Sequence, residues 1–285
     1  MLALVSPGKT VRKKRSTPAP TLSDALGSVS SSAEAGRFAS KMPLVNYPAF
    51  YPVDEWLQWP ALRSKRDLGQ PPPRTKLERL HWEHVFAYAG PCCYMHRDAH
   101  GDAAMYFLPA IEGGRSGAAC PFDTGSVEKG RLRPVVPPRR RMGFVERHSV
   151  DLSAWRQTFS RWLTHCYSFP DRYFETTGDR YRDGAPERTI PDALCQENGE
   201  PGRRLHGKDA CADRRAWTWE VRVVESIPFA EGRLLHVPFQ KLRRAHDFKK
   251  RYGLRCEIRT LPRHDPAGPD SLYRHSGIVI RDMVT

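Results

Sequence analysis

The most recognisable chemical motif in this sequence is Asp123-Thr124-Gly125-Ser126, which directly follows Phe122. Aspartic proteases use an aspartate in this context, but they need two carboxylates that share one proton around a water molecule. A two-lobed enzyme therefore carries the motif twice, and this sequence contains it once. Pro121 also disfavours the strand that would hold a catalytic aspartate. The motif predicts a turn in which Asp123 accepts a backbone hydrogen bond and Gly125 has a positive φ angle.

A second group of potentially reactive side chains lies within residues 81–100 and consists of His81, His84, Cys92, Cys93, His96 and His100. A structural zinc site needs four such ligands, usually in paired short spacings. The two cysteines are adjacent, and the zinc-deaminase pattern of His-x-Glu followed by Pro-Cys-x-x-Cys is matched only in part. We therefore expect no metal, with a zinc site as the alternative.

The sequence lacks the glycine-containing motifs of several large enzyme classes. It contains no Gly-x-x-x-x-Gly-Lys loop, no Gly-x-Gly-x-x-Gly fingerprint and no Gly-x-Ser-x-Gly nucleophile elbow. The first two hold nucleotide phosphates and dinucleotides, and the third presents a catalytic serine. Motifs therefore give no support to an ATPase, a dinucleotide dehydrogenase or an α/β-hydrolase.

Glu220 is unusual because it lies within an aromatic and β-branched segment, residues 217–227. The segment alternates with a period of two, which predicts a strand with Trp219 and Val221 on one face and Glu220 and Arg222 on the other. If the second face meets solvent, Glu220 and Arg222 simply pair with each other, and we expect this arrangement. If it lines a dry site, the carboxylate is a candidate catalytic group.

Thr218-Trp219-Glu220-Val221 and residues 81–130 resemble parts of an ADP-ribosyltransferase-like domain of the bacterial toxin or defence type. That family uses a His or Arg on an early strand, an aromatic residue that stacks on nicotinamide, and a glutamate on a late strand. The resemblance implies that NAD is the substrate and that Glu220 and His81 are catalytic, with His84 as the alternative to His81. The implied substrate-binding residues are Tyr88 or Tyr94 at the nicotinamide, and Thr124 and Ser126 in place of the family's Ser-Thr-Ser segment.

The chemistry of this resemblance agrees with the residue types. Cleavage of the glycosidic bond of NAD builds positive charge on the ribose, and a buried carboxylate stabilises such a cation best when water is excluded. Glu220 supplies the carboxylate in this interpretation. The acceptor of the ADP-ribose is then nucleic acid or protein.

The charge of the chain suggests a second function. The formal net charge is +14, from 46 Lys and Arg against 32 Asp and Glu, and such an excess favours nucleic acid or an acidic protein as partner. Basic side chains bind phosphates and release counterions, which gives affinity without sequence preference. The candidates are Arg139, Arg140, Arg141, Lys241, Arg243, Arg244, Lys249 and Lys250. The alternatives to an enzyme are therefore a nucleic-acid-binding protein and an interaction protein with an acidic partner.

Cellular location is indicated only by composition. No run of residues approaches the roughly 18–20 apolar residues of a membrane helix, so we expect no membrane contact. The 7 cysteines are odd in number, irregularly spaced and not preceded by a secretory signal. This pattern favours reduced thiols and a cytoplasmic location.

The 285 residues are enough for a sizeable core, and 25 prolines with 21 glycines predict a loop-rich chain. Residues 1–42 predict a disordered basic tail; a start at Met42, a partner contact through Arg12–Arg15 and a transit peptide are the alternatives. Residues 43–76 predict an irregular aromatic and proline-rich strap and linker. Residues 77–285 predict a single α+β domain with a polar insertion at about 170–215.

Several elements must position the candidate residues. Three- and four-residue spacing of apolar residues predicts a helix over residues 152–169, and residues 76–88 predict a helix or a helix followed by a strand. A basic helix is expected over residues 239–252, with Gly253 as its C-cap. The expected strands are residues 103–111, 217–227, 233–239, 254–261 and 276–284. This order favours an α+β fold with a mixed, mainly antiparallel sheet and a few helices.

Overall fold

The computed structural model describes residues 21–46, 53–90, 105–108, 114–129, 137–174, 218–260 and 279–284. The strands are β1 (Leu44–Asn46), β2 (Ala61–Leu62), β3 (Val85–Ala89), β4 (Met105–Leu108), β5 (Gly117–Cys120), β6 (Val150–Asp151), β7 (Glu220–Val223), β8 (Ile227–Pro228), β9 (Leu234–Val237) and β10 (Glu257–Thr260). The α-helices are α1 (Leu22–Leu26), α2 (Ala33–Lys41), α3 (Val53–Trp56), α4 (Lys76–Glu83), α5 (Thr124–Glu128), α6 (Arg141–Arg147), α7 (Trp155–Cys166) and α9 (Leu242–Arg251), and residues 279–284 are also helical.

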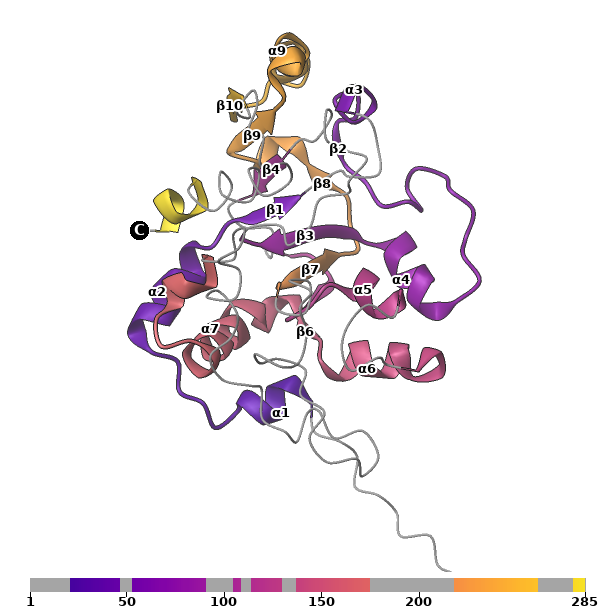
Figure 1. Ribbon diagram of the computed structural model, residues 1–285. Coiled ribbons are helices and arrows are strands. Elements are labelled where there is room, and N and C mark those ends of the chain that lie inside the picture. Colours follow the sequence, from indigo (N-terminus) through magenta and orange to yellow (C-terminus); the bar gives the residue numbers. More distant parts are fainter. Residues whose placement is uncertain are drawn as a thin grey trace, which may run out of the picture.

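One twisted sheet organises the described part of the chain (Figure 1). Its strand order is β10-β9-β4-β1-β3-β7-β5-β6, and β2 and β8 form a separate pair. The β9–β10 pair is parallel, and the other neighbours in the large sheet are antiparallel. This arrangement confirms the predicted α+β class and its mainly antiparallel sheet. None of the helices in the described ranges has the length and hydropathy needed to span a membrane.

The predicted aromatic helix is present as α7 and packs on one face of the sheet. Trp155, Phe159 and Trp162 are fully buried. The ring of Trp219, directly before β7, lies with its centroid 5.3 Å from that of Phe159 and 5.9 Å from that of Trp162. Because side chains alternate along a strand, Glu220 and Arg222 lie on the opposite face of β7.

The prediction of disorder is wrong for residues 21–42. Leu22, Leu26, Phe38 and Met42 are buried against the core that includes α7. The few large apolar residues of this segment lie among many Ser, Ala and Gly residues, and this composition is typical of a disordered tail. Hydrogen bonds reinforce the contact, since the Ser32 amide donates to Thr164 Oγ1 at 3.1 Å. Residues 1–20, with the Arg12–Arg15 cluster, lie outside the described residues.

The stability of α2 can be tested at its first residue. Ser32 is the N-cap of α2, and its hydroxyl accepts a hydrogen bond from the Ala35 amide. Replacing Ser32 with alanine is expected to lower the free energy of unfolding by about 1 kcal/mol, since the amide loses its acceptor. Urea denaturation measures the change, and the exposed Ser30→Ala serves as the control. Equal stability of the two variants would contradict a folded α2.

Two further predictions about the organisation need correction. Residues 43–76 contain β1, which lies inside the sheet between β3 and β4, so this segment does more than cover the core. The predicted insertion begins with the 3-10 turn Pro170–Phe174, in which Tyr173 is buried and donates a hydrogen bond to the Ala89 carbonyl at 2.7 Å. The rest of the insertion, residues 175–217, lies outside the described residues.

The C-terminal strand prediction is also wrong. Residues 279–284 are helical, with Ile280 and Val284 buried. These two positions are four apart, so they share a helix face, although the same short apolar run also fits a strand. The basic helix prediction is confirmed by α9, which is followed by Gly253 with φ 61° as expected for a C-cap.

Candidate active site

The candidate site lies on the face of β7 that α7 does not cover. In the antiparallel sheet, Glu220 is directly opposite Tyr88 of β3 and Cys120 of β5. Arg222 is opposite Phe86 and Ala118 in the same way. Directly opposed residues share a face, so the side chains of Glu220, Tyr88 and Cys120 lie next to each other.

The chain then turns from β5 into α5, and Asp123 is the N-cap of this helix. Its Oδ1 accepts a hydrogen bond from the Gly125 amide at 3.1 Å, and its Oδ2 accepts one from Ser126 Oγ at 2.7 Å. The backbone hydrogen bond agrees with the predicted turn, but Gly125 is a helical residue without the expected positive φ. Both carboxylate oxygens of Asp123 thus stabilise the start of α5, which gives no support to a protease role.

Thr124 connects α5 to the glutamate of β7. Its amide donates a hydrogen bond to Glu220 Oε2 at 3.1 Å, and its hydroxyl lies 2.7 Å from Glu220 Oε1. Thr124 is fully buried and Glu220 is 1% exposed. Two donors therefore hold the carboxyl group in one orientation inside the protein.

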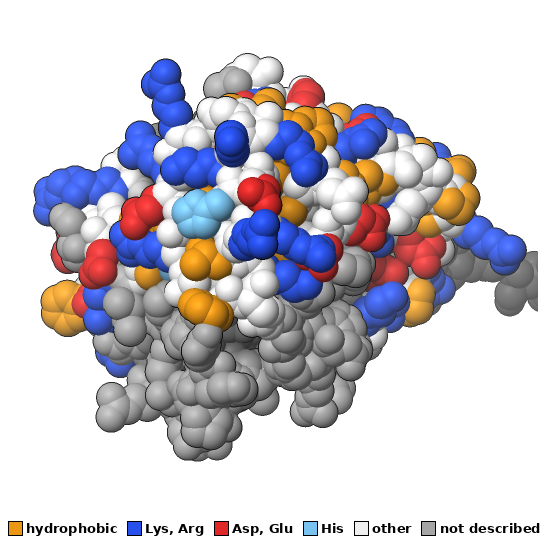
Figure 2. All heavy atoms as spheres, turned by 90° about the horizontal axis from the view of Figure 1, so that it is seen from above, with side chains coloured by type: hydrophobic (Ala, Val, Ile, Leu, Met, Phe, Trp, Pro, Cys, Tyr) orange, Lys and Arg blue, Asp and Glu red, His pale blue; other side chains and the backbone are white. Residues whose placement is uncertain are grey.

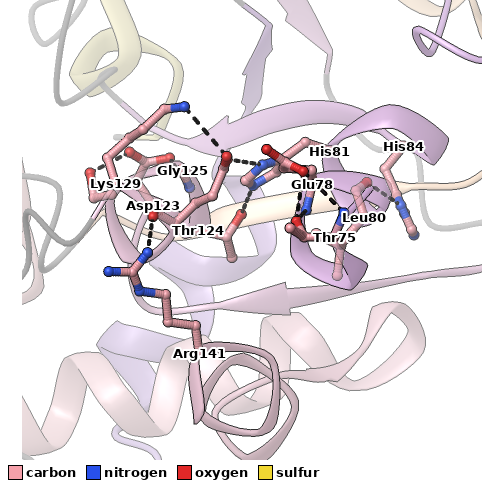
Figure 3. Close-up of polar contacts among 12 residues, drawn as sticks. Thr75, Glu78, Leu80, His81, His84, Asp123, Thr124, Gly125, Lys129 and Arg141 are labelled. Atoms are coloured by element: carbon pink, nitrogen blue, oxygen red, sulfur yellow. Dashed lines mark hydrogen bonds and ion pairs between the residues drawn. The ribbon is translucent and has the colours of Figure 1, made fainter. Parts of the chain in front are cut away.

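His81 completes a continuous chain of hydrogen bonds. Its Nε2 lies 2.8 Å from Thr124 Oγ1, and its Nδ1 lies 2.7 Å from Glu128 Oε2 at the end of α5. Figure 3 shows His81 pointing from α4 toward Thr124. The capping box of Thr75 and Glu78 fixes the start of α4 and thereby the position of the histidine. The resemblance implied an early strand for this residue, and the structure places it on a helix.

Burial and charge shift the protonation of the acidic groups in opposite directions. Desolvation, helped by the charge of Asp123, raises the pKa of Glu220 to about 8, although Arg222 and Thr124 counteract the rise. The hydrogen bond from His81 lowers the pKa of Glu128. Burial also raises the pKa of the Cys120 thiol, so this cysteine is no nucleophile at neutral pH. In the ligand-free site, burial therefore favours the protonated form of Glu220, and the hydrogen bond with His81 favours the ionised form of Glu128.

Arg222 is the buried cation of the site. It is 2% exposed, and its Nε lies 3.7 Å from Glu220 Oε1. Its Nη2 donates a hydrogen bond to Ser149 Oγ at 2.6 Å, whereas Nε and Nη1 make no hydrogen bond with any of the described residues. The prediction that Glu220 and Arg222 pair on a solvent-exposed face is therefore wrong about the exposure, since both residues are buried. The alternation of β7 was predicted correctly, but the second face is covered as well.

The comparisons with known proteins are sparse. No protein-family model matches this sequence, and no curated protein matches it. Among solved structures, the chain is similar to Thermus sp. 2.9 DarT in complex with NAD+, with 11% identity and a TM-score of 0.38 over 77% of this chain and 94% of that chain. It is similar to the same protein in complex with ADP-ribosylated ssDNA, with 12% identity and a TM-score of 0.37 over 77% and 93% of the two chains. Similarity at this level shows nothing about the residues of the site.

The structure brings together most of the residues that the sequence singled out. Glu220, Thr124 and His81 are linked by hydrogen bonds, and Tyr88 lies beside Glu220. Ser126 is near through its bond to Asp123. His84 Nδ1 instead donates a hydrogen bond to the Leu80 carbonyl at 2.8 Å, and Tyr94 lies outside the described residues. Glu128 was missed, although its spacing of four residues from Thr124 places both on one side of a helix.

The zinc hypothesis concerns residues that are mostly outside the described ranges, namely Cys92, Cys93, His96 and His100. Among the described residues, no group of three or more His, Cys, Asp or Glu side chains is arranged to hold a metal ion. Both ring nitrogens of His81 have protein partners in Thr124 and Glu128. The two described members of the predicted cluster, His81 and His84, therefore make hydrogen bonds within the protein.

The predicted basic residues fall into two separate places. Arg139, Arg140 and Arg141 lie at the start of α6, and Arg141 donates a hydrogen bond to the Glu128 carbonyl beside the candidate site (Figure 3). Helix α9 joins β9 to β10, and β9 is separated from β7 by β4, β1 and β3. At about 4.8 Å per strand, β9 is roughly 19 Å from β7. The two groups therefore cannot act as one short phosphate-binding cluster.

Proposed function

We propose that this protein is an ADP-ribosyltransferase that uses NAD as substrate. The observation that supports this best is the buried carboxyl group of Glu220, held by the amide and hydroxyl of Thr124 and followed by His81. The sequence resemblance implied these three residues independently of their positions in space. Tyr88, opposite Glu220 in the sheet, provides the aromatic ring for nicotinamide.

The proposed reaction breaks the bond between the ribose C1′ and the nicotinamide nitrogen, and the electron pair of that bond leaves with nicotinamide. Positive charge then develops on the ribose, where the ionised carboxylate of Glu220 stabilises it. The acceptor attacks C1′ and loses a proton. Nicotinamide in NAD is itself cationic, so substrate binding favours the ionised form of Glu220 and lowers its pKa from the value in the free protein.

Glu220 is 1% exposed, so the substrate reaches it only when neighbouring groups move. NAD binding is therefore expected to change the hydrogen exchange of α5, whose first residue holds Glu220. The test of function is NAD consumption and transfer of labelled ADP-ribose in the presence of DNA, RNA and cell extract. Transfer to one of these polymers supports the proposal and identifies the acceptor. A folded protein that neither binds NAD nor consumes it would contradict the proposal.

A second function, nucleic-acid binding without catalysis, is favoured by α9. Arg243 and Lys250 are exposed on this helix, and Lys249 is half-buried. Two other predicted contacts are already occupied, because Lys241 Nζ and Arg244 Nη1 lie 2.7 Å and 2.5 Å from Asp54 Oδ2. Figure 2 shows basic side chains on this end of the molecule interspersed with acidic and hydrophobic ones. Any binding here is expected to be weak and salt-dependent.

The salt dependence of binding tests this second function. Replacing Arg243 and Lys250 with glutamine is expected to reduce the log–log salt slope of single-stranded DNA binding by about 1.4, since each lost phosphate contact on a single strand contributes about 0.7. The measurement is a fluorescence titration with labelled single-stranded DNA at several salt concentrations. Arg259→Gln is the control, because Arg259 is already paired with Glu257. An unchanged slope in the double variant would exclude α9 as the contact.

A further inference from the structure

The hydrogen bonds around Thr124 allow two arrangements of the same protons. In the first, the imidazolium of His81 donates from Nε2 to Thr124 Oγ1, and the Thr124 hydroxyl donates to an ionised Glu220. In the second, Glu220 is protonated and donates to Thr124 Oγ1, and the Thr124 hydroxyl donates to a neutral His81. The separations of 2.7 Å to Glu220 and 2.8 Å to His81 fit hydrogen bonds in both directions. The Thr124 hydroxyl is donor and acceptor in both arrangements.

We propose that Thr124 relays a proton between Glu220 and His81, so that the half-buried His81–Glu128 pair accepts the proton that the buried site must release. The O–H bond at Glu220 Oε1 breaks as its proton moves to Thr124 Oγ1. The original hydroxyl proton of Thr124 moves at the same time to His81 Nε2. The products are a carboxylate and an imidazolium, and no proton is gained or lost.

Glu128 determines the direction of the relay. Its Oε2 lies 2.7 Å from His81 Nδ1, so it accepts a hydrogen bond from this nitrogen and leaves Nε2 to bond with Thr124. The side chains of His81 and Glu128 are 15% and 17% exposed, whereas Glu220 is 1% exposed. Water therefore reaches the accepting end of the relay and not the glutamate.

The charges around the relay come from several elements. Asp123 and Arg222 act on Glu220 from α5 and β7, and Tyr88 and Cys120 are the titratable neighbours on β3 and β5. Around the histidine, the neighbouring groups are Glu128 and Lys129 at the end of α5, His84 after α4, and Arg141 of α6.

The role of the relay in catalysis depends on the proposed function. In ADP-ribosyl transfer, an acceptor N–H or O–H group gives its proton to Glu220 as it attacks the ribose. Transfer of that proton through Thr124 to His81 restores the carboxylate for the next substrate. The relay thus favours an acceptor that loses a proton in the reaction. Thr124 acts through Glu220 and His81, so it is a positioning residue.

The relay can be tested without NAD, by nitrogen-15 NMR of the His81 ring between pH 5 and 10. In the wild-type protein, the Nε2 signal is expected to shift in two steps, because its proton is shared with Glu220. Thr124→Ser keeps the hydroxyl and both steps, whereas Thr124→Val and Glu220→Gln leave a single step. A single step in the wild-type protein, or two steps in Thr124→Val, would overturn the proposal. Should Thr124→Val fail to fold, the wild-type, Thr124→Ser and Glu220→Gln results still decide it.

Turnover provides a second readout that separates the relay from the proposed function. If the protein consumes NAD, Thr124→Val is expected to lower kcat by about 10- to 100-fold and alter its pH profile, with Thr124→Ser close to wild type. Equal kcat and equal pH profiles for Thr124→Val and wild type would overturn the catalytic role of the relay. The NMR signature without NAD turnover would support the relay and contradict the proposed function.

Discussion

Replacing Glu220 with glutamine is expected to reduce NAD turnover by about 100- to 1,000-fold, because the developing positive charge on the ribose loses its carboxylate. Glutamine has nearly the same shape and can keep its hydrogen bonds to the amide and hydroxyl of Thr124. Loss of activity in this variant therefore reports on charge and not on packing. The assay is nicotinamide release at saturating NAD, with the exposed Glu146→Gln as the matched control.

The activity of the wild-type protein is expected to depend on pH through the same residue. The pKa of Glu220 is raised to about 8, and the reaction needs the ionised form. In the free protein this form becomes more abundant as pH rises, so kcat/KM is expected to increase from about pH 6 through about pH 8 and to level off about one pH unit higher. A kcat/KM that falls over this range would contradict Glu220 as the catalytic carboxylate.

The substitution Glu220→Gln is also expected to stabilise the protein at high pH. The folded protein binds the Glu220 proton more tightly than the unfolded chain does, where the pKa is near its ordinary value of 4.5. The resulting stabilisation is complete below that value and is lost as pH rises through about 8. Glu220→Gln removes this loss, so its advantage over wild type should grow from pH 6 to pH 9, to the order of a few kcal/mol. Urea denaturation at both pH values measures it, and parallel curves for the two proteins would contradict a buried glutamate.

Replacing Arg222 with methionine is expected to lower the free energy of unfolding by about 3–5 kcal/mol at pH 9, where Glu220 is ionised. Methionine fills part of the space, but it leaves the carboxylate of Glu220 without the buried cation. Ser149 also loses its hydrogen-bond donor. The loss should be smaller at pH 6, because a protonated Glu220 no longer needs the cation. Since Arg222 lowers the pKa of Glu220, its removal should also shift the rise in activity toward higher pH.

A double-mutant cycle separates this charge effect from packing. Adding Glu220→Gln to Arg222→Met is expected to recover part of the lost stability at pH 9, since the double variant buries one fewer unpaired charge. The exposed Arg255→Met is the control for loss of an arginine and is expected to change stability little. Additive effects of the two substitutions at pH 9 would show that Glu220 and Arg222 do not interact.

Local patterns in the sequence were sufficient for the elements with strong periodicity. The spacing of Trp155, Phe159 and Trp162 predicted α7, because apolar residues three and four apart form one helix face. The alternation around Glu220 predicted the strand and the two faces of β7. Local signals of this kind depend only on neighbours along the chain, so they are readable without a structure.

Other parts of the fold depend on contacts that the sequence does not display. The N-terminal segment has few large apolar residues among its polar ones, including Leu22, Leu26 and Phe38. Their burial depends on contacts with α7, which lies more than 100 residues later in the chain. The sequence therefore suggested a disordered tail where the structure has α1 and α2. The apolar run that ends in Val284 fits a strand or a helix equally well, and tertiary packing selected the helix.

The sequence by itself determined the candidate residues Glu220, His81 and Thr124 and the face of β7 on which the glutamate lies. Only the tertiary structure decided that this face is buried, because alternation along one strand does not show what covers it. The folded chain also decided that Thr124 lies between Glu220 and His81, since these residues come from α5, β7 and α4. Hydrogen bonds between distant segments require the complete sheet and its helices to hold them, and no local pattern encodes them.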